Sequence, residues 1–271
     1  MNVNRRELVE LLLVLALTMV ILSYPDLSVE TMVLYSFVSS VGVLLHEFAH
    51  KYAASRLGKV DVRIRAYYLG MILGLLTAVR SGGEFVLMLP AYTAWEEPTS
   101  PLEVLFDESS DEVKERRFVE ELRKDALIAL AGVAVNGLIA LASFLALMII
   151  RSFYGGFYNF LIEAARGGSV LQFFLPLILL NVSWFNGMLS FINLIPLPLP
   201  LPLPSPSFAS TDGLLFAGSA VELIRRGRYK NIPWKMFVLS LVGALIYILL
   251  EFFGIISAEI FYAYDKVLKI S

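Results

Sequence analysis

The sequence contains no cysteine, which excludes a disulfide framework and any metal site built on thiolates. Histidine is nearly absent as well: the 271 residues include two, His46 and His50, which lie four positions apart. The formal net charge is −2, so no strong basic field predicts a nucleic-acid partner. A metal site in this chain would therefore be built from one pair of imidazoles and from carboxylates.

Apolar residues, by contrast, are in excess. They make up 58% of the chain, whereas soluble domains contain about 45–50%. The excess is concentrated in long stretches with few charges, which indicates that a lipid bilayer is the solvent of most of the chain. We therefore expect an all-α polytopic protein of the cell membrane, with about five to six transmembrane helices.

The apolar runs and the breaks between them divide the chain into three parts. Residues 1–29 are expected to form a first transmembrane helix, residues 30–226 a membrane core, and residues 227–271 a C-terminal transmembrane helix with an interfacial tail. Within the core we expect, in order, a helix that contains both histidines and ends at Gly58, a re-entrant hairpin at 60–95, a soluble helical linker at 96–125, a helix at 126–150, and a broken helix at 171–224 with a proline-rich loop.

The hairpin is predicted from a change of period after the histidine helix. From Val60 to Tyr68 apolar and polar side chains alternate, as in a half-buried strand. Residues 69–79 are apolar and interrupted by glycine, too few to span a bilayer as a helix, and 84–93 has the pattern of a second strand. We interpret the region as a small membrane-re-entrant β-hairpin or sheet. Irregular backbone at membrane depth needs protein or a wet cavity beside it, so a cleft is expected there.

The two histidines belong to the run His46–Glu47–Phe48–Ala49–His50. Side chains at positions i and i+4 of a helix point the same way, so the two imidazoles can bind one metal ion. Glu47 lies about 100° further round the helix, where it can take a proton from a water activated by zinc. Two histidines and a glutamate in an apolar helix are costly unless they are paired or coordinated. The pattern therefore predicts one zinc ion per chain, with Glu47 as general base and acid.

A catalytic zinc ion takes three protein ligands and keeps one position open. Without cysteine or a third histidine, the remaining ligand has to be a carboxylate. Asp212 is the best candidate, because it follows a break in the helical pattern and precedes Gly213, where the backbone can approach closely. The alternative role for Asp212 is that of a helix N-cap. The other acidic residues within apolar sequence are Glu10, Glu84, Glu222 and Glu251.

Three segments together resemble the site-two protease family of intramembrane zinc metalloproteases. They are the HEFAH run at 46–50, the sequence Asn-Leu-Ile-Pro-Leu-Pro at 193–198, and the pair Asp-Gly at 212–213. The order of these motifs, the intervening hairpin and the small-residue run at 131–136 are also similar to the family. Two features depart from its pattern. The segment between Asn193 and Asp212 is longer and filled with Pro-Leu repeats, and position 211 is threonine where the family favours an apolar residue.

The resemblance implies that residues 30–226 form a catalytic core. The implied zinc ligands are His46, His50 and Asp212, with Glu47 as the general base and acid. The expected function is that of a zinc metalloendopeptidase that cleaves transmembrane segments of other membrane proteins. The alternative is a non-proteolytic membrane protein, such as a transporter or an assembly factor, with a structural metal site.

The resemblance also places Asn193 in the cleft, where its amide would donate to the substrate carbonyl or to the developing oxyanion. An interhelical hydrogen bond is the alternative role for this residue. Lysine and arginine are frequent at 51–65, 114–124 and 225–230, which predicts that these segments, and with them the active site, lie toward the cytoplasm. The expected partners are the lipid bilayer and a transmembrane protein substrate, whereas the sequence does not specify an oligomeric state.

Overall fold

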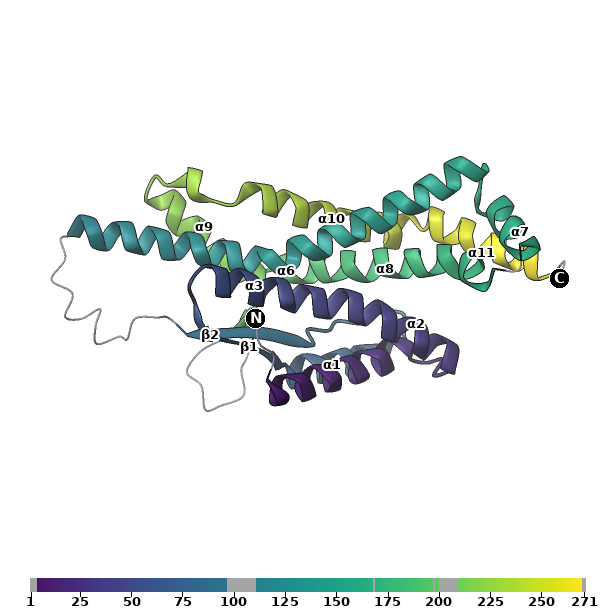
Figure 1. The fold of residues 1–271 in the computed structure, drawn as a ribbon, viewed down its shortest axis with the longest axis horizontal. Helices are drawn as coiled ribbons and strands as arrows, with labels where there is room; N and C mark the ends of the chain where they lie inside the picture. The colour runs from purple at the N-terminus through teal and green to yellow at the C-terminus, as the bar shows by residue number, and fades with distance from the viewer. Residues whose placement is uncertain (1–3, 97–110, 168, 197, 200–208, 270–271) are drawn as a thin grey trace.

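The computed structural model describes residues 4–96, 111–167, 169–196, 198–199 and 209–269 of the chain. Within them the protein is mostly helical, and most helices run along one long axis (Figure 1). The helices are α1 (Arg5–Ser23), α2 (Val29–Ser39), η1 (Ser40–Leu44), α3 (Leu45–Arg56), α4 (Tyr68–Ser81), α6 (Asp111–Tyr154), α7 (Phe157–Arg166), α8 (Val170–Leu194), α9 (Asp212–Arg225), η2 (Tyr229–Asn231), α10 (Trp234–Phe253) and α11 (Ile255–Leu268). The strands are β1 (Val60–Ala66), β2 (Ala91–Glu96), β3 (Pro198–Leu199) and β4 (Ala209–Ser210).

Four helices in the described part of the chain are long and apolar enough to cross a membrane, which suggests a membrane protein. They are the continuous helix formed by α2, η1 and α3, then α6, α8 and most of α10. The helix α1 is not among them, and its first two turns carry Arg5, Arg6, Glu7 and Glu10. Length and composition thus identify four candidate spans, where the sequence led us to expect about five to six.

A small sheet lies where the sequence predicts one. Strands β1 and β2 pair antiparallel, with Ile64 opposite Thr93 and Ala66 opposite Ala91. The first strand matches its predicted position, but the second begins at Ala91 rather than at Glu84 and is displaced toward the C-terminus. Both strands lie beside α3, so the sheet covers one side of the helix that carries the histidines (Figure 1).

The apolar segment between the two strands is a helix, so this part of the predicted hairpin is wrong. At 14 residues, α4 is too short to cross a bilayer, but a helix satisfies most of its backbone groups internally. Gly70 and Gly74 lie one turn apart on its buried side. A Cβ at these positions would meet the carbonyl of Leu89 at 2.1 Å and the side chain of Met88 at 2.8 Å. The glycines therefore form the contact face on which the following chain packs.

The boundary expected between a soluble linker at 96–125 and a spanning helix at 126–150 is not present in the described residues. The helix α6 runs without interruption for 44 residues, while 97–110 lie outside the described part of the chain. No glycine or proline occurs between Asp111 and Ala131, so nothing ends the helix where its composition changes from charged to apolar. A single long helix thus joins the two predicted parts.

The helix predicted at 171–224 is broken as expected, between α8 and α9. Most of the proline-rich loop lies outside the described residues. Its two ends are joined by the antiparallel pairing of β3 with β4. They are also joined by Thr211, whose hydroxyl donates a 2.5 Å hydrogen bond to the carbonyl of Ile195. The start of α9 is thereby fixed beside the end of α8.

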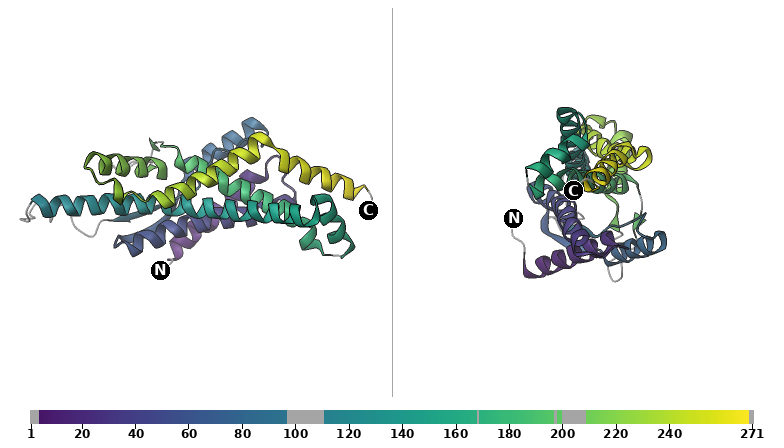
Figure 2. Two further views of the ribbon diagram at one scale, coloured as in Figure 1. Left: turned by 90° about the horizontal axis from the view of Figure 1, so that it is seen from above. Right: turned by 90° about the vertical axis from the view of Figure 1, so that its right-hand side faces the viewer.

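The helices α6, α8 and α10 pack against one another (Figure 2). Glycines let their backbones approach closely. A Cβ on Gly137 would lie 2.3 Å from the carbonyl of Leu239, and one on Gly187 would lie 2.9 Å from the carbonyl of Gly243. Such small-residue contacts are typical of helices that associate within a membrane. They set the position of α6, which forms one wall of the site described below.

Two carboxylates tie α1 to α3 and β1. Buried Glu7 accepts hydrogen bonds from Lys51 Nζ at 2.6 and 2.7 Å and from the backbone N–H of Ile64 at 2.9 Å. Glu10 accepts from the backbone N–H of Ala66 at 3.1 Å. Because Lys51 directly follows the second histidine, α1 braces the helix that carries both histidines.

Candidate metal centre

His46 and His50 lie on one face of α3, one turn apart, as their spacing predicts. Their Nε2 atoms are 3.0 Å apart, and the residues are 7% and 4% exposed. The π-helical turn η1 immediately precedes α3, and such turns are frequent at functional sites. The helix ends at Arg56, and Gly58 follows it with a φ of 87°, the left-handed conformation expected for glycine after a helix.

Asp212 completes the group from the first residue of α9. Its Oδ2 lies 3.4 Å from His46 Nε2 and 3.2 Å from His50 Nε2. A tetrahedral zinc site with ligand bonds of about 2.0–2.1 Å has its ligand atoms roughly 3.3–3.4 Å apart. The three observed separations, 3.0, 3.4 and 3.2 Å, are close to that value. These residues can therefore hold one metal ion.

Asp212 is available as a ligand because its neighbour caps the helix. Thr211 is the N-cap of α9, and its hydroxyl accepts from the N–H of Leu214 at 3.4 Å, so the N-cap role considered for Asp212 is wrong. The Oδ2 atom of Asp212 is buried and has no hydrogen-bond partner among the described residues. Burial raises the pKa of this carboxyl, but the nearby imidazoles of His50 and His46 outweigh that effect. Its pKa therefore lies below the ordinary value.

The other acidic candidates for the third ligand are engaged elsewhere or lie apart from the histidines. In the part of the chain that the structure describes, none of them belongs to the group of converging ligand atoms. Three have clear partners: Glu10 accepts from the N–H of Ala66, Glu222 from Arg226 Nε at 2.6 Å, and Glu251 from Trp184 Nε1 at 2.7 Å.

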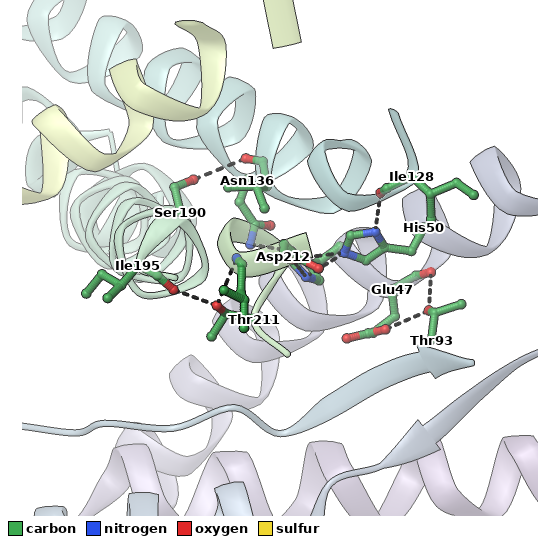
Figure 3. Close-up of polar contacts among 12 residues, drawn as sticks. Glu47, His50, Thr93, Ile128, Asn136, Ser190, Ile195, Thr211 and Asp212 are labelled. Atoms are coloured by element: carbon green, nitrogen blue, oxygen red, sulfur yellow. Dashed lines mark hydrogen bonds and ion pairs between the residues drawn. The ribbon is translucent and has the colours of Figure 1, made fainter. Parts of the chain in front are cut away.

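The helix α6 backs both imidazoles with three residues spaced one turn apart, of which Ile128 and Asn136 are labelled in Figure 3. The carbonyl oxygen of Ile128 lies 2.7 Å from His50 Nδ1, and the Asn136 side chain lies 3.0 Å from His46 Nδ1. Between them, a Cβ on Gly132 would lie 2.3 Å from His50 Nε2, so any residue larger than glycine would collide with the ring. Both Nδ1 atoms are thus engaged by α6, and both Nε2 atoms face the aspartate. In the sequence, the spacing of four between Gly132 and Asn136 was the one indication that this face of α6 lies against the imidazoles.

Glu47 lies on the side of α3 that faces the sheet (Figure 3). The residue is 3% exposed, and its Oε2 accepts a 2.8 Å hydrogen bond from the hydroxyl of Thr93 in β2. This bond holds the carboxylate beside the three ligands. Sequence reasoning did not identify Thr93, because alternation along a strand does not reveal which other element its side chains will meet.

Asn193 lies buried in the last turn of α8, 6% exposed. Its backbone carbonyl is close to Gly213, where a Cβ would lie 2.9 Å from that oxygen. The fold therefore brings Asn193 beside the residue that follows Asp212, although a long proline-rich segment separates them in sequence. Its role toward a substrate stays a prediction.

Comparison with known proteins finds no family model, no curated protein and no solved structure that matches the chain. The site is therefore defined by its own geometry. It consists of two histidines and one aspartate with converging ligand atoms, a buried glutamate next to them in α3, and a surrounding of apolar helices.

Proposed function

We propose that the protein is an intramembrane zinc metalloprotease of the kind that the site-two protease family represents. The observation that carries the proposal is the convergence of His46, His50 and Asp212, with Glu47 in the same turn of α3. Three protein ligands leave one coordination position open, which is the pattern of catalytic rather than structural zinc sites. Zinc held there would activate water and polarise the carbonyl group of a peptide bond.

Glu47 would carry out the proton transfers. Its carboxylate accepts a proton from the attacking water as the water oxygen bonds to the carbonyl carbon. The carboxyl group then delivers that proton to the peptide nitrogen as the C–N bond breaks. The hydrogen bond from Thr93 limits Glu47 to one orientation, so the base does not have to be ordered during the reaction. The Asn193 amide would donate to the developing oxyanion.

The proposed substrate is a transmembrane segment of another protein. A helix hides its carbonyl groups in hydrogen bonds, so such a segment has to unwind locally before attack. Strand β2 offers a place for the extended form: among the described residues it pairs with β1 alone. A substrate strand added along β2 would run beside the residue that contacts Glu47.

The proposed location is the cell membrane, with the site toward the cytoplasm. Lys59 pairs with Glu121 at 2.9 Å, and Arg226 pairs with Glu115. The basic segments that follow α3 and α9 therefore lie at the same end as the charged start of α6. Clusters of lysine and arginine beside transmembrane helices favour the cytoplasmic side, and this end of the molecule is also the end nearest the metal ligands.

The proposal is tested with the purified full chain in detergent and a model substrate that contains one transmembrane segment. We expect cleavage that a zinc chelator abolishes and that added zinc restores. Glu47→Gln should retain zinc and lose cleavage, because it keeps the shape of the side chain and removes the base. Substantial cleavage by Glu47→Gln refutes the general-base role. A chain that holds zinc but never cleaves, with or without chelator, favours the alternative of a structural metal.

A further inference from the structure

Asn136 is a fully buried carboxamide within an apolar part of α6. It is 0% exposed, its Nδ2 lies 3.0 Å from His46 Nδ1, and its Oδ1 has no hydrogen-bond partner among the described residues. Burying such a group costs free energy unless both of its ends find partners. The contact with His46 supplies a partner for one of these two ends.

The protonation of the histidine decides which end of the carboxamide belongs at this contact. A neutral imidazole that gives Nε2 to a metal carries its proton on Nδ1, so the partner of Nδ1 has to be an acceptor. A half turn of the carboxamide about its Cβ–Cγ bond exchanges nitrogen and oxygen within the same shape. We propose that Asn136 is a positioning residue of the metal centre: its Oδ1 accepts from His46 Nδ1–H, and so orients the ring and selects the tautomer that exposes Nε2.

The second histidine supports this assignment independently. His50 Nδ1 lies 2.7 Å from the carbonyl oxygen of Ile128, which can only accept. His50 therefore carries its proton on Nδ1 and exposes Nε2, the arrangement inferred for His46. Gly132 lies midway between the two acceptors on the same stripe of α6 and makes room for both rings. One face of α6 thus presents an acceptor to each imidazole.

The inference rests on the proposed zinc site, but it is tested by metal affinity rather than by cleavage. The affinity of the full chain for zinc is measured in detergent by competition with a chromogenic chelator. We expect Asn136→Leu, which keeps the branched shape of the side chain and removes the acceptor, to bind zinc about 10–100-fold more weakly. Asn136→Asp retains an acceptor, so its affinity should stay within a few-fold of that of the wild type.

Asn186 provides a matched control. It is also 0% exposed, its Oδ1 also has no partner among the described residues, and its Nδ2 donates to the carbonyl of Val182 in its own helix. Asn186→Leu should therefore leave zinc affinity unchanged. If Asn136 had a purely structural role, Asn136→Asp should weaken zinc binding more than Asn136→Leu does. The reason is that a carboxylate buried without a partner is more disruptive than leucine.

Two results overturn the inference: an Asn136→Leu protein that binds zinc as tightly as the wild type, or an Asn136→Asp protein that loses affinity by the same 10–100-fold factor. The aspartate variant decides the question if the leucine variant does not fold. A wild-type chain that takes up no zinc removes the proposed function and the inference together. Zinc uptake by the wild type with unchanged affinity in the variants removes the inference alone.

Discussion

The hydroxyl of Thr93 lies 2.8 Å from the carboxylate of Glu47 and joins the small sheet to the helix that carries His46 and His50. The two residues are 46 positions apart in the sequence, and Thr93 lies within β2. If a substrate strand pairs with β2, the strand that positions the substrate also positions the general base. Displacement of β2 would then change the orientation of Glu47 without touching the metal ligands.

Thr93→Val removes this hydroxyl and keeps the shape of the side chain. We expect kcat to fall about tenfold, since one hydrogen bond to a charged group contributes roughly 1.5 kcal/mol and each ~1.4 kcal/mol is a factor of ten in rate. Zinc content and KM should not change, because Glu47 is neither a ligand nor a substrate-binding group. Steady-state kinetics on the model substrate measure both constants. Thr93→Ser should keep most of the activity, and an equal loss in the serine variant would contradict the argument.

Asp212→Ala removes the only carboxylate of the ligand group. Two histidines alone bind zinc weakly, so we expect the zinc content of the purified chain to fall from about one per chain to a small fraction of that. Elemental analysis after extensive dialysis measures it. Glu222→Ala changes a carboxylate of the same helix that pairs with Arg226 instead, and it should keep its zinc. Equal metal content in the two variants would remove Asp212 from the ligand set.

Gly132→Ala adds a methyl group where the imidazoles lie. Its Cβ would be 2.3 Å from His50 Nε2 and 2.9 Å from His46 Cε1, so at least one ring has to move off the metal position. We expect zinc binding to weaken by at least about tenfold, and by more if the displaced imidazole cannot return to the metal position. Gly218→Ala is the control, because a Cβ there has nothing within 4 Å. That variant should bind zinc normally and melt at the same or a slightly higher temperature.

Glu7→Gln breaks the buried ion pair with Lys51, in which both side chains are almost completely shielded. Removal of one partner leaves a buried charge uncompensated, which typically costs about 3–5 kcal/mol. We expect a clear drop in the thermal unfolding temperature in detergent, and Glu7→Gln combined with Lys51→Met should recover part of it. Lys269→Ala disrupts a pair with Asp265 in which both side chains are mostly exposed, and its effect should be within about 1 kcal/mol. A Glu7→Gln protein as stable as Lys269→Ala would show that the brace contributes nothing.

The parts of the fold that the sequence predicted well are those set by local patterns. The helix of the histidines, its end before Gly58, strand β1 and the break before α9 all follow from apolar periodicity, glycine and proline. The predictions that were wrong inferred the conformation of a segment from its residue composition alone. Glycines in an apolar run suggested a hairpin but form the packing face of α4, and a change from charged to apolar residues suggested a boundary that α6 does not have.

The sequence by itself determined that His46 and His50 share one face of a helix, because that relation depends only on helical geometry over four residues. It also determined that a third ligand would be a carboxylate, because no cysteine or third histidine exists. The tertiary structure alone decided that Asp212 faces the imidazoles. It also decided that α6 and β2 supply the residues that hold His46 and Glu47. Those contacts join elements far apart in the chain, so they depend on how the helices pack and not on any local pattern.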